Sequence, residues 1–276
     1  MRKDDRITIY VSPGELFWIA GNLKLNSLPL IGGYFRGRTP DQIRDELQQG
    51  YSTLESRGYI ISDGTTREVD QTLVNLVNMI ASPNYALLVS TSSKEGSTVQ
   101  TYVYVKGSQS LSLVLKSRLY HITLYREEPV LIRSYLEWLG ISTQMSEKVV
   151  PFRMPQKDLR TLLSKVWLPL PQAQAALQEF GLSQAETNKM IEMLQPFTFV
   201  SSVNRLSWQN NQIVKQGSVL LVGNSTAIWL VENPDTSGDP PMLQPMVSKV
   251  AASIVNRYLR PELSGFADES LNEIVS

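Results

Sequence analysis

The sequence predicts an α+β fold made of two similar halves, in which antiparallel β-sheet is flanked by bundles of helices. Helix-start signals precede segments with apolar residues at helical spacing, and runs of alternating apolar and polar residues follow with short connections. The order of helices, strands and a closing helix then occurs a second time. We interpret this repetition as a diverged, quasi-twofold internal duplication within one integrated domain.

The halves are expected at residues 1–143 and 144–260, with residues 261–276 as a flexible tail. Two helices of the first half begin with a hydroxyl N-cap, a proline at the first helical position and Glu or Gln at the third, a combination that satisfies free N–H groups. They start after Ser12 and after Thr39, and Arg57-Gly58 ends the second. A third helix is expected over roughly Arg67–Ala81, before Ser82-Pro83.

Strands should follow these helices, because the apolar residues now recur at every second position. They are expected over Tyr85–Thr91, 99–105, 111–115 and Leu119–Arg126, and a helix over Glu128–Leu139 closes the half. Short connections, such as the turn at Gly107-Ser108, favour antiparallel pairing.

The second half repeats this order more compactly. Its predicted helices cover Pro155–Val166, Gln172–Phe180 and Gln184–Leu194, the last with a capping box at Ser183. Strands over Phe197–Arg205, Gln212–Gly223 and Thr226–Glu232 come next, and after a loop at Asn233–Pro241 a long amphipathic helix begins near Met246.

Composition argues against several classes of protein. Lys plus Arg and Asp plus Glu both number 26, so the basic excess typical of nucleic-acid binders is absent. The chain contains no cysteine, which excludes disulfides and Cys-ligated metals. Its charged N-terminus lacks the apolar segment of a signal peptide, and no apolar run is long enough to cross a membrane, so we expect a cytoplasmic protein.

No constellation of residues indicates catalysis, a cofactor or a metal site, and we expect a protein that is not an enzyme. His121 is the only histidine and lies in a predicted strand, where a structural place on the sheet is the favoured interpretation. The loop Gly32–Arg38 carries two aromatics and two arginines. It either holds an anionic group or, as we favour, connects two helices while its aromatics fold back onto the core.

Two segments are candidates for contact with a partner protein. One is the polar turn between strands, expected to protrude, formed by Ser92, Ser93, Lys94, Glu95, Gly96 and Ser97. The other is the apolar connector that contains Trp167, Leu168 and Leu170. If exposed, this connector is a docking patch; if buried, it joins two helices.

The ordered features resemble the EspG family, the cytosolic chaperones of type VII (ESX) secretion. The likeness rests on an opening strand at Arg6–Val11, the helix ending Leu54–Tyr59, Ala81-Ser82-Pro83, Phe180-Gly181-Leu182 and a late strand with Trp229. The resemblance implies a quasi-twofold antiparallel sheet between two helical bundles. It also implies a chaperone that keeps helical secretion substrates soluble before export, such as PE–PPE heterodimers in mycobacteria.

Carried onto this sequence, the family's partner contacts fall on Ser92–Ser97 and on the helices around Trp167–Leu194. The resemblance implies a small helical substrate, PE–PPE-like or WXG-type. The chain is rich in Gln, Asn and Ser rather than in the Ala and Arg usual in the family, which leaves the identity of this partner open.

The alternative is a DNA-binding regulator in which Thr39–Ile61 forms a recognition helix followed by a wing. The acidic residues of this segment, Asp41, Asp45, Glu46 and Glu55, argue against it because they offset Arg44 and Arg57.

Overall fold

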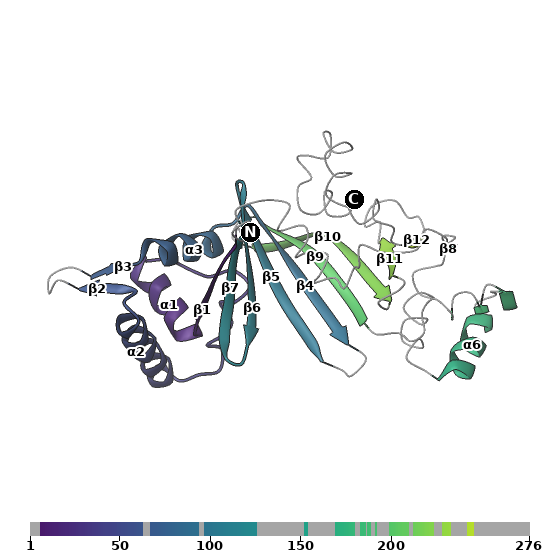
Figure 1. The fold of residues 1–276 in the computed structure, drawn as a ribbon, viewed down its shortest axis with the longest axis horizontal. Helices are drawn as coiled ribbons and strands as arrows, with labels where there is room; N and C mark the ends of the chain where they lie inside the picture. The colour runs from purple at the N-terminus through teal and green to yellow at the C-terminus, as the bar shows by residue number, and fades with distance from the viewer. Residues whose placement is uncertain are drawn as a thin grey trace, which may run out of the picture. The chain divides into compact units, whose positions relative to one another are not determined.

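The computed structural model describes residues 6–62, 67–93, 97–125, 152–153, 169–179, 183–185, 187–188, 191, 199–209, 212–223, 228–232 and 242–245 (Figure 1). The chain divides into two compact units. Unit 1 comprises Met1–Ala86 and Gln100–Leu131, and unit 2 comprises Leu87–Val99 and Ile132–Ser276. The predicted seam near residue 143 and the predicted tail lie outside the described residues.

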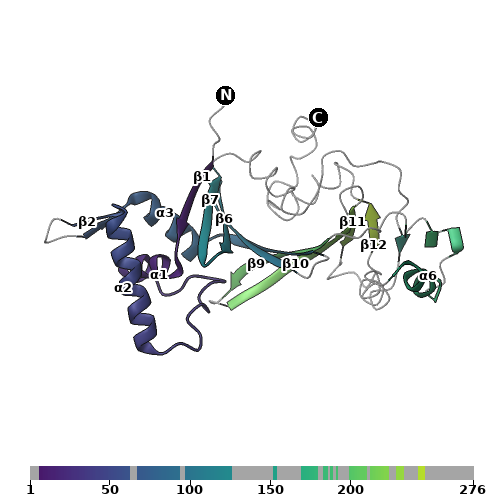
Figure 2. The ribbon, with the colours of Figure 1, turned by 60° about the horizontal axis from the view of Figure 1, so that its bottom comes forward.

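The described part of unit 1 contains three helices, which gather at one side of its strands (Figures 1 and 2). They are α1 (Pro13–Asn22), α2 (Pro40–Ser56) and α3 (Gln71–Ala81). The caps predicted for α1 and α2 are confirmed: the side chains of Ser12 and Thr39 accept from the backbone N–H three residues on, and Glu15 and Gln42 bond back to the caps. Local side-chain chemistry therefore sets where both helices begin.

The third helix differs from its prediction, because it begins at Gln71 rather than near Arg67. Asp70 is the N-cap, and its carboxylate accepts from the backbone N–H groups of Thr72 and Leu73. The residues before it form β3 (Arg67–Val69), paired antiparallel with β2 (Ile60–Ser62). Asp70 thus separates a short hairpin from the helix.

Four strands of unit 1 run side by side in the order β1-β7-β6-β5. They are β1 (Arg6–Val11), β5 (Thr98–Lys106), β6 (Gln109–Lys116) and β7 (Leu119–Tyr125), and the first two residues of β5 belong to unit 2. The pairs β1/β7, β7/β6 and β6/β5 are all antiparallel, as predicted.

Strand register places an apolar face on this part of the sheet. Leu111 lies opposite Tyr104, and Leu113 lies opposite Ile122; all four side chains are buried. The hydroxyl of Tyr104 donates to the backbone carbonyl of Pro29 at 2.8 Å, so the one polar atom of this large buried ring is satisfied.

Two glycines allow α1 and α2 to cross with their backbones in contact. A Cβ atom added to Gly50 would lie 2.4 Å from the carbonyl carbon of Gly14, and one added to Gly14 would lie 2.4 Å from the carbonyl oxygen of Glu46. No larger residue fits at this crossing without displacing a helix.

Unit 2 contains most of β4 (Tyr85–Ser93), whose first two residues belong to unit 1, and a helix, α6 (Leu170–Glu179). Its other strands are β8 (Phe152–Arg153), β9 (Phe199–Gln209), β10 (Gln212–Gly223), β11 (Ile228–Glu232) and β12 (Met242–Pro245). The strand order is β4-β9-β10-β11-β12-β8, and the pairs from β9 to β8 are antiparallel.

The α+β class is confirmed by these helices and antiparallel strands. Strand β10 has the predicted bounds, β9 begins two residues later than Phe197, and β8 and β12 were not predicted. After Ser183, residues 184–185, 187–188 and 191 are helical, in agreement with the capped helix predicted there. The predicted helices over Glu128–Leu139, Pro155–Val166 and from Met246 lie outside the described residues.

Candidate protein-binding surface

The end of the hairpin formed by β4 and β5 is held together by paired hydroxyls. Ser93 Oγ lies 2.8 Å from Ser97 Oγ, and Ser92 Oγ lies 2.9 Å from Thr98 Oγ1. The backbone N–H of Ser93 also donates to the carbonyl of Ser97 at 2.9 Å. Such cross-strand pairs stabilise a hairpin end, so three predicted contact residues, Ser92, Ser93 and Ser97, come together. Lys94, Glu95 and Gly96 lie outside the described residues.

Strand β5 adds an apolar side chain to this hairpin end. Val99 is 47% exposed, although it lies on the same face of β5 as the buried Thr101 and Val103. Pairing of β5 with β6 begins only at Thr101, opposite Val114, so Val99 lies before the paired residues although β6 continues to Lys116. The alternation of Val99 with Thr101 and Val103 suggested a buried position, and no sequence signal marked where the pairing of β5 with β6 begins.

The apolar connector is described only from Pro169 onward, so Trp167 and Leu168 lie outside the described residues. Leu170 is the first residue of α6 and is 44% exposed, whereas Ala173, Ala176 and Leu177 of the same helix are buried. The carbonyl of Pro169 accepts from the N–H groups of Gln172 and Ala173 at 2.9 and 3.1 Å, which fixes the helix start. Leu170 is therefore accessible to a partner protein, and it lies on a different element of unit 2 from the β4–β5 hairpin end.

The Gly32–Arg38 loop folds its aromatics against α1, as favoured from the sequence. The ring of Phe17 lies 4.8 Å from that of Phe35 and 6.1 Å from that of Tyr34. The guanidinium of Arg38 sits 4.5 Å from the centre of the Tyr34 ring and forms an ion pair with Glu46. Arg38 is thus already engaged, which leaves the exposed Arg36 as the loop's other cation.

His121 lies on β7, directly opposite Tyr10 of β1, in agreement with a structural place on the sheet. The two rings meet edge to face, with centroids 4.7 Å apart and an interplanar angle of 86°. Among the described residues, no group of three or more His, Asp or Glu side chains is placed to hold a metal ion. In the same part of the chain, no helix is long and apolar enough to cross a membrane.

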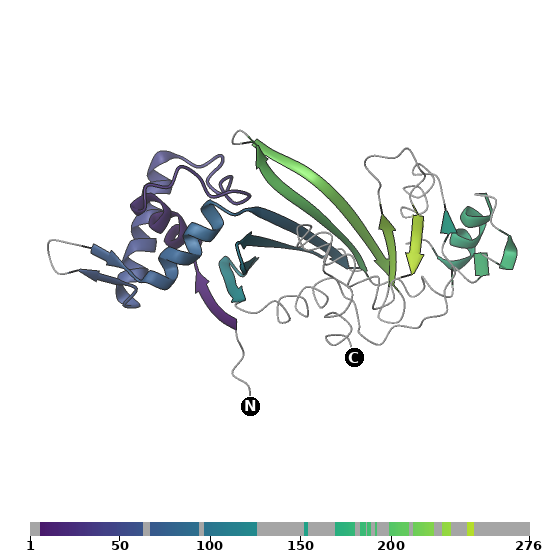
Figure 3. The same ribbon diagram turned by 90° about the horizontal axis from the view of Figure 1, so that it is seen from above.

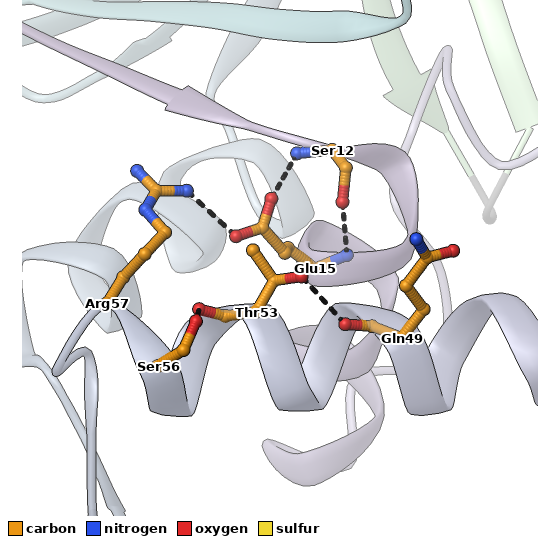
Figure 4. Close-up of polar contacts among 6 residues, drawn as sticks. All are labelled: Ser12, Glu15, Gln49, Thr53, Ser56 and Arg57. Atoms are coloured by element: carbon orange, nitrogen blue, oxygen red, sulfur yellow. Dashed lines mark hydrogen bonds and ion pairs between the residues drawn. The ribbon is translucent and has the colours of Figure 1, made fainter.

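A buried carboxylate joins α1 to the end of α2 (Figure 4). Glu15 is 1% exposed and accepts from the N–H of Ser12 at 2.5 Å and from the guanidinium of Arg57 at 2.8 Å. The capping pattern predicted the bond to Ser12, but nothing in the sequence predicted a partner as distant as Arg57. This network orders the helices and offers no open position for a ligand.

The structure contains only part of what the DNA-binding alternative predicts. A short hairpin, β2–β3, does follow α2, as a wing would. However, Arg57 pairs with the buried Glu15, and Arg44 pairs with Asp41 on its own helix at 3.0 Å. Both arginines are therefore neutralised by carboxylates, which leaves little attraction for phosphate.

Comparison with solved structures shows which known protein this fold is similar to. The Mycobacterium tuberculosis type VII secretion system chaperone EspG5, solved in complex with a PE25–PPE41 dimer, aligns with a TM-score of 0.65 at 12% sequence identity. The alignment covers 92% of this chain and 96% of that chain. No family model and no curated protein sequence matches. The fold is therefore similar to that of a type VII secretion chaperone over nearly the whole length of both chains.

Proposed function

We propose that this chain is an EspG-like binding protein, a chaperone or adaptor of type VII secretion that keeps a helical secretion substrate soluble before export. The observation that carries the proposal is the fold shared with EspG5 over 92% of this chain. The DNA-binding alternative gains no support from that likeness.

The exposed apolar residues of unit 2 support a protein partner. Val99 is 47% exposed at a hairpin end, and Leu170 is 44% exposed at a helix start. Apolar positions of this kind can receive the apolar face of an amphipathic helix, a common mode of helix recognition. The hydroxyl pairs at Ser92–Thr98 and Ser93–Ser97 support a hairpin that is ordered before the partner arrives, which reduces the entropy lost on binding.

The proposed role needs binding in the cytoplasm and no turnover. The one histidine supports this interpretation, because His121 packs against Tyr10 on the sheet. Arg38 and Arg57 support it as well, since each is occupied by a carboxylate of its own unit.

Co-expression with small helical secretion substrates tests the proposal. The tagged chain is expressed with a PE–PPE pair or with a WXG-type protein encoded near its own gene. We expect the substrate to move from the insoluble to the soluble fraction and to co-elute with the chain at a defined molar ratio in light scattering. Substrates that stay insoluble and never co-elute, across both classes, would contradict a chaperone role.

Substitutions at the proposed contacts locate the surface. Leu170→Asp and Lys94→Glu should each weaken the complex about tenfold or more, because each places an unfavourable charge at a contact. Ile213→Asp is the matched control, since Ile213 is similarly exposed in unit 2 but lies outside the predicted contacts. If the control weakens binding and the two contact variants do not, the surface has been assigned to the wrong residues.

A further inference from the structure

Among the strands that the structure describes, β1 is the end strand of unit 1 and pairs on one side only, with β7 (Figure 3). Six consecutive residues, Arg6–Val11, pair with β7 in one regular register. On the polar face Arg6, Thr8 and Tyr10 are exposed, with Tyr10 at 49%. The backbone N–H and C=O groups of β1 point alternately toward β7 and away from it, so about half of them do not face a described strand.

This edge lacks the features with which sheets usually prevent pairing between molecules. Charges, prolines, bulges and very short strands are the common ones. Strand β1 has no proline, no break in register and a single charge, Arg6 at its start. The end strand of unit 2, β8, is by contrast only two residues long and includes Arg153.

The apolar face of β1 is incompletely covered. Val11 and its partner on β7, Tyr120, are 0% and 3% exposed, whereas Ile7 and Ile9 are only half-buried. Both isoleucines alternate onto the same face as Val11. An additional strand beside β1 would extend this face and bury both side chains further.

We propose that a second copy of this chain occupies the edge, with the two β1 strands antiparallel about a twofold axis. Two registers keep polar and apolar faces matched, one centred on Thr8 and one on Ile9. The first places Ile7 opposite Ile9 of the other copy, and the second places Thr8 opposite Tyr10. In either register, apolar residues of one copy therefore lie opposite apolar residues of the other, and polar residues lie opposite polar ones.

Electrostatics also permits a second copy. In the register centred on Thr8, the two Arg6 residues are offset by four positions, or roughly 13 Å, which exceeds the Debye length of about 8 Å at physiological ionic strength. The formal net charge of the chain is zero, so no long-range repulsion opposes association. One short strand pair buries less than the ~1,000 Å² of a stable interface, so the dimer should be weak and concentration-dependent.

Cysteine crosslinking tests this pairing cleanly, because the chain has no cysteine of its own. Thr8→Cys reports the register centred on Thr8, and Ile9→Cys reports the register centred on Ile9, because each register places the two copies of its central residue opposite one another. Under mild oxidation, at least one of them should form disulfide-linked dimers about tenfold faster than Ser108→Cys, an exposed control in the turn after β5. Unmodified protein should show a concentration-dependent sedimentation coefficient that Thr8→Lys abolishes.

Crosslinking of both β1 variants no faster than Ser108→Cys would overturn the proposal, as would a sedimentation coefficient that stays monomeric up to the solubility limit. Circular dichroism of Thr8→Lys separates loss of pairing from loss of fold. If that variant sediments as a monomer but is unfolded, crosslinking of the two folded cysteine variants decides the question.

Discussion

Glu15 combines two roles that are usually held by different residues. Its carboxylate completes the cap of α1 and also accepts from Arg57 at the end of α2, while almost no surface of Glu15 reaches solvent. A buried carboxylate is costly unless its oxygens are bonded, and both oxygens of Glu15 are. The same side chain therefore caps the start of one helix and binds the arginine at the end of another.

Glu15→Ala should lower the free energy of unfolding by about 2 kcal/mol, because it removes a helix cap and a charged hydrogen bond. Urea denaturation followed by circular dichroism measures this loss. Asp41→Asn is the control: the Asp41–Arg44 pair lies on the exposed surface of α2 and should contribute under ~0.5 kcal/mol. Equal losses for the two variants would mean that Glu15 acts only as an ordinary surface charge.

Three tyrosines on the apolar face of unit 1 should make stability fall at alkaline pH. Burial, with a smaller effect of Tyr102, raises the pKa of Tyr120 from 10.0 to about 12, and burial also raises the pKa values of Tyr102 and Tyr104. The unfolded chain releases these protons near pH 10 while the folded chain retains them. The stabilisation is therefore complete below pH 10 and is lost as pH rises toward 12.

Unfolding experiments at pH values from 10 to 12 test this expectation, with tyrosinate absorbance recorded in parallel. Tyr120→Phe removes one of the ionisable groups, so the decline of its stability with pH should be shallower than that of the wild type. Identical slopes for the two proteins would show that Tyr120 ionises equally easily in both states.

At the scale of elements, the crossing of α1 and α2 depends on the absence of two side chains. Gly50→Ala should destabilise the protein by roughly 2–3 kcal/mol, because the new methyl group meets backbone atoms of Gly14 that cannot move independently. Gly21→Ala is the matched control on α1, since a Cβ atom added there would have no neighbour within 4 Å, and it should stabilise by up to about 1 kcal/mol. Thermal unfolding of both variants distinguishes packing from helix propensity.

The turn between β6 and β7 is occupied by residues that its conformation disfavours. Ser117 and Arg118 both have positive φ, at 49° and 68°. Two-residue hairpins of this kind prefer Asn-Gly. The double variant Ser117→Asn, Arg118→Gly should therefore raise the free energy of unfolding by about 1 kcal/mol, measurable by urea denaturation. A neutral or destabilising result would mean that the native side chains make compensating contacts.

Sequence patterns predicted elements well where local chemistry decides them. The caps at Ser12 and Thr39 and the bounds of β10 agree with the structure, because capping and period-two alternation operate within a few residues. Strands β8 and β12, of two and four residues, are too short for any periodicity to be visible. The start of α3 was misplaced because the apolar Val69 of β3 happens to continue the helical spacing of Leu73 and Leu76.

The candidate surface was predictable only in its location along the chain. The polar stretch at Ser92–Ser97 indicated a turn, but the pairing of Ser92 with Thr98 depends on register. The exposure of Val99 depends on where the pairing of β5 with β6 begins, and the link from Glu15 to Arg57 depends on how two helices cross. Contacts of this kind are properties of the assembled fold, which no window of sequence contains.

For the whole molecule, balanced charge has a measurable consequence. The chain has 26 basic and 26 acidic residues and a sequence pI near 6.6. Proteins near zero net charge lose the repulsion that keeps copies apart. Solubility should therefore pass through a minimum close to pH 6.6 and rise on either side, which precipitation assays across pH can show. A flat profile would mean that local charge patterns outweigh net charge.

The pairing of β1 with β7 also has a consequence for the newly made chain. Arg6 is synthesised well before its partner on β7, Tyr125, because the two are 125 − 6 = 119 positions apart in the sequence. At about 5–20 residues per second, the ribosome completes β7 roughly 6–24 s after β1. During that interval a strongly strand-forming segment waits without its neighbour. This interval is therefore when the protein depends most on being kept apart from other nascent chains.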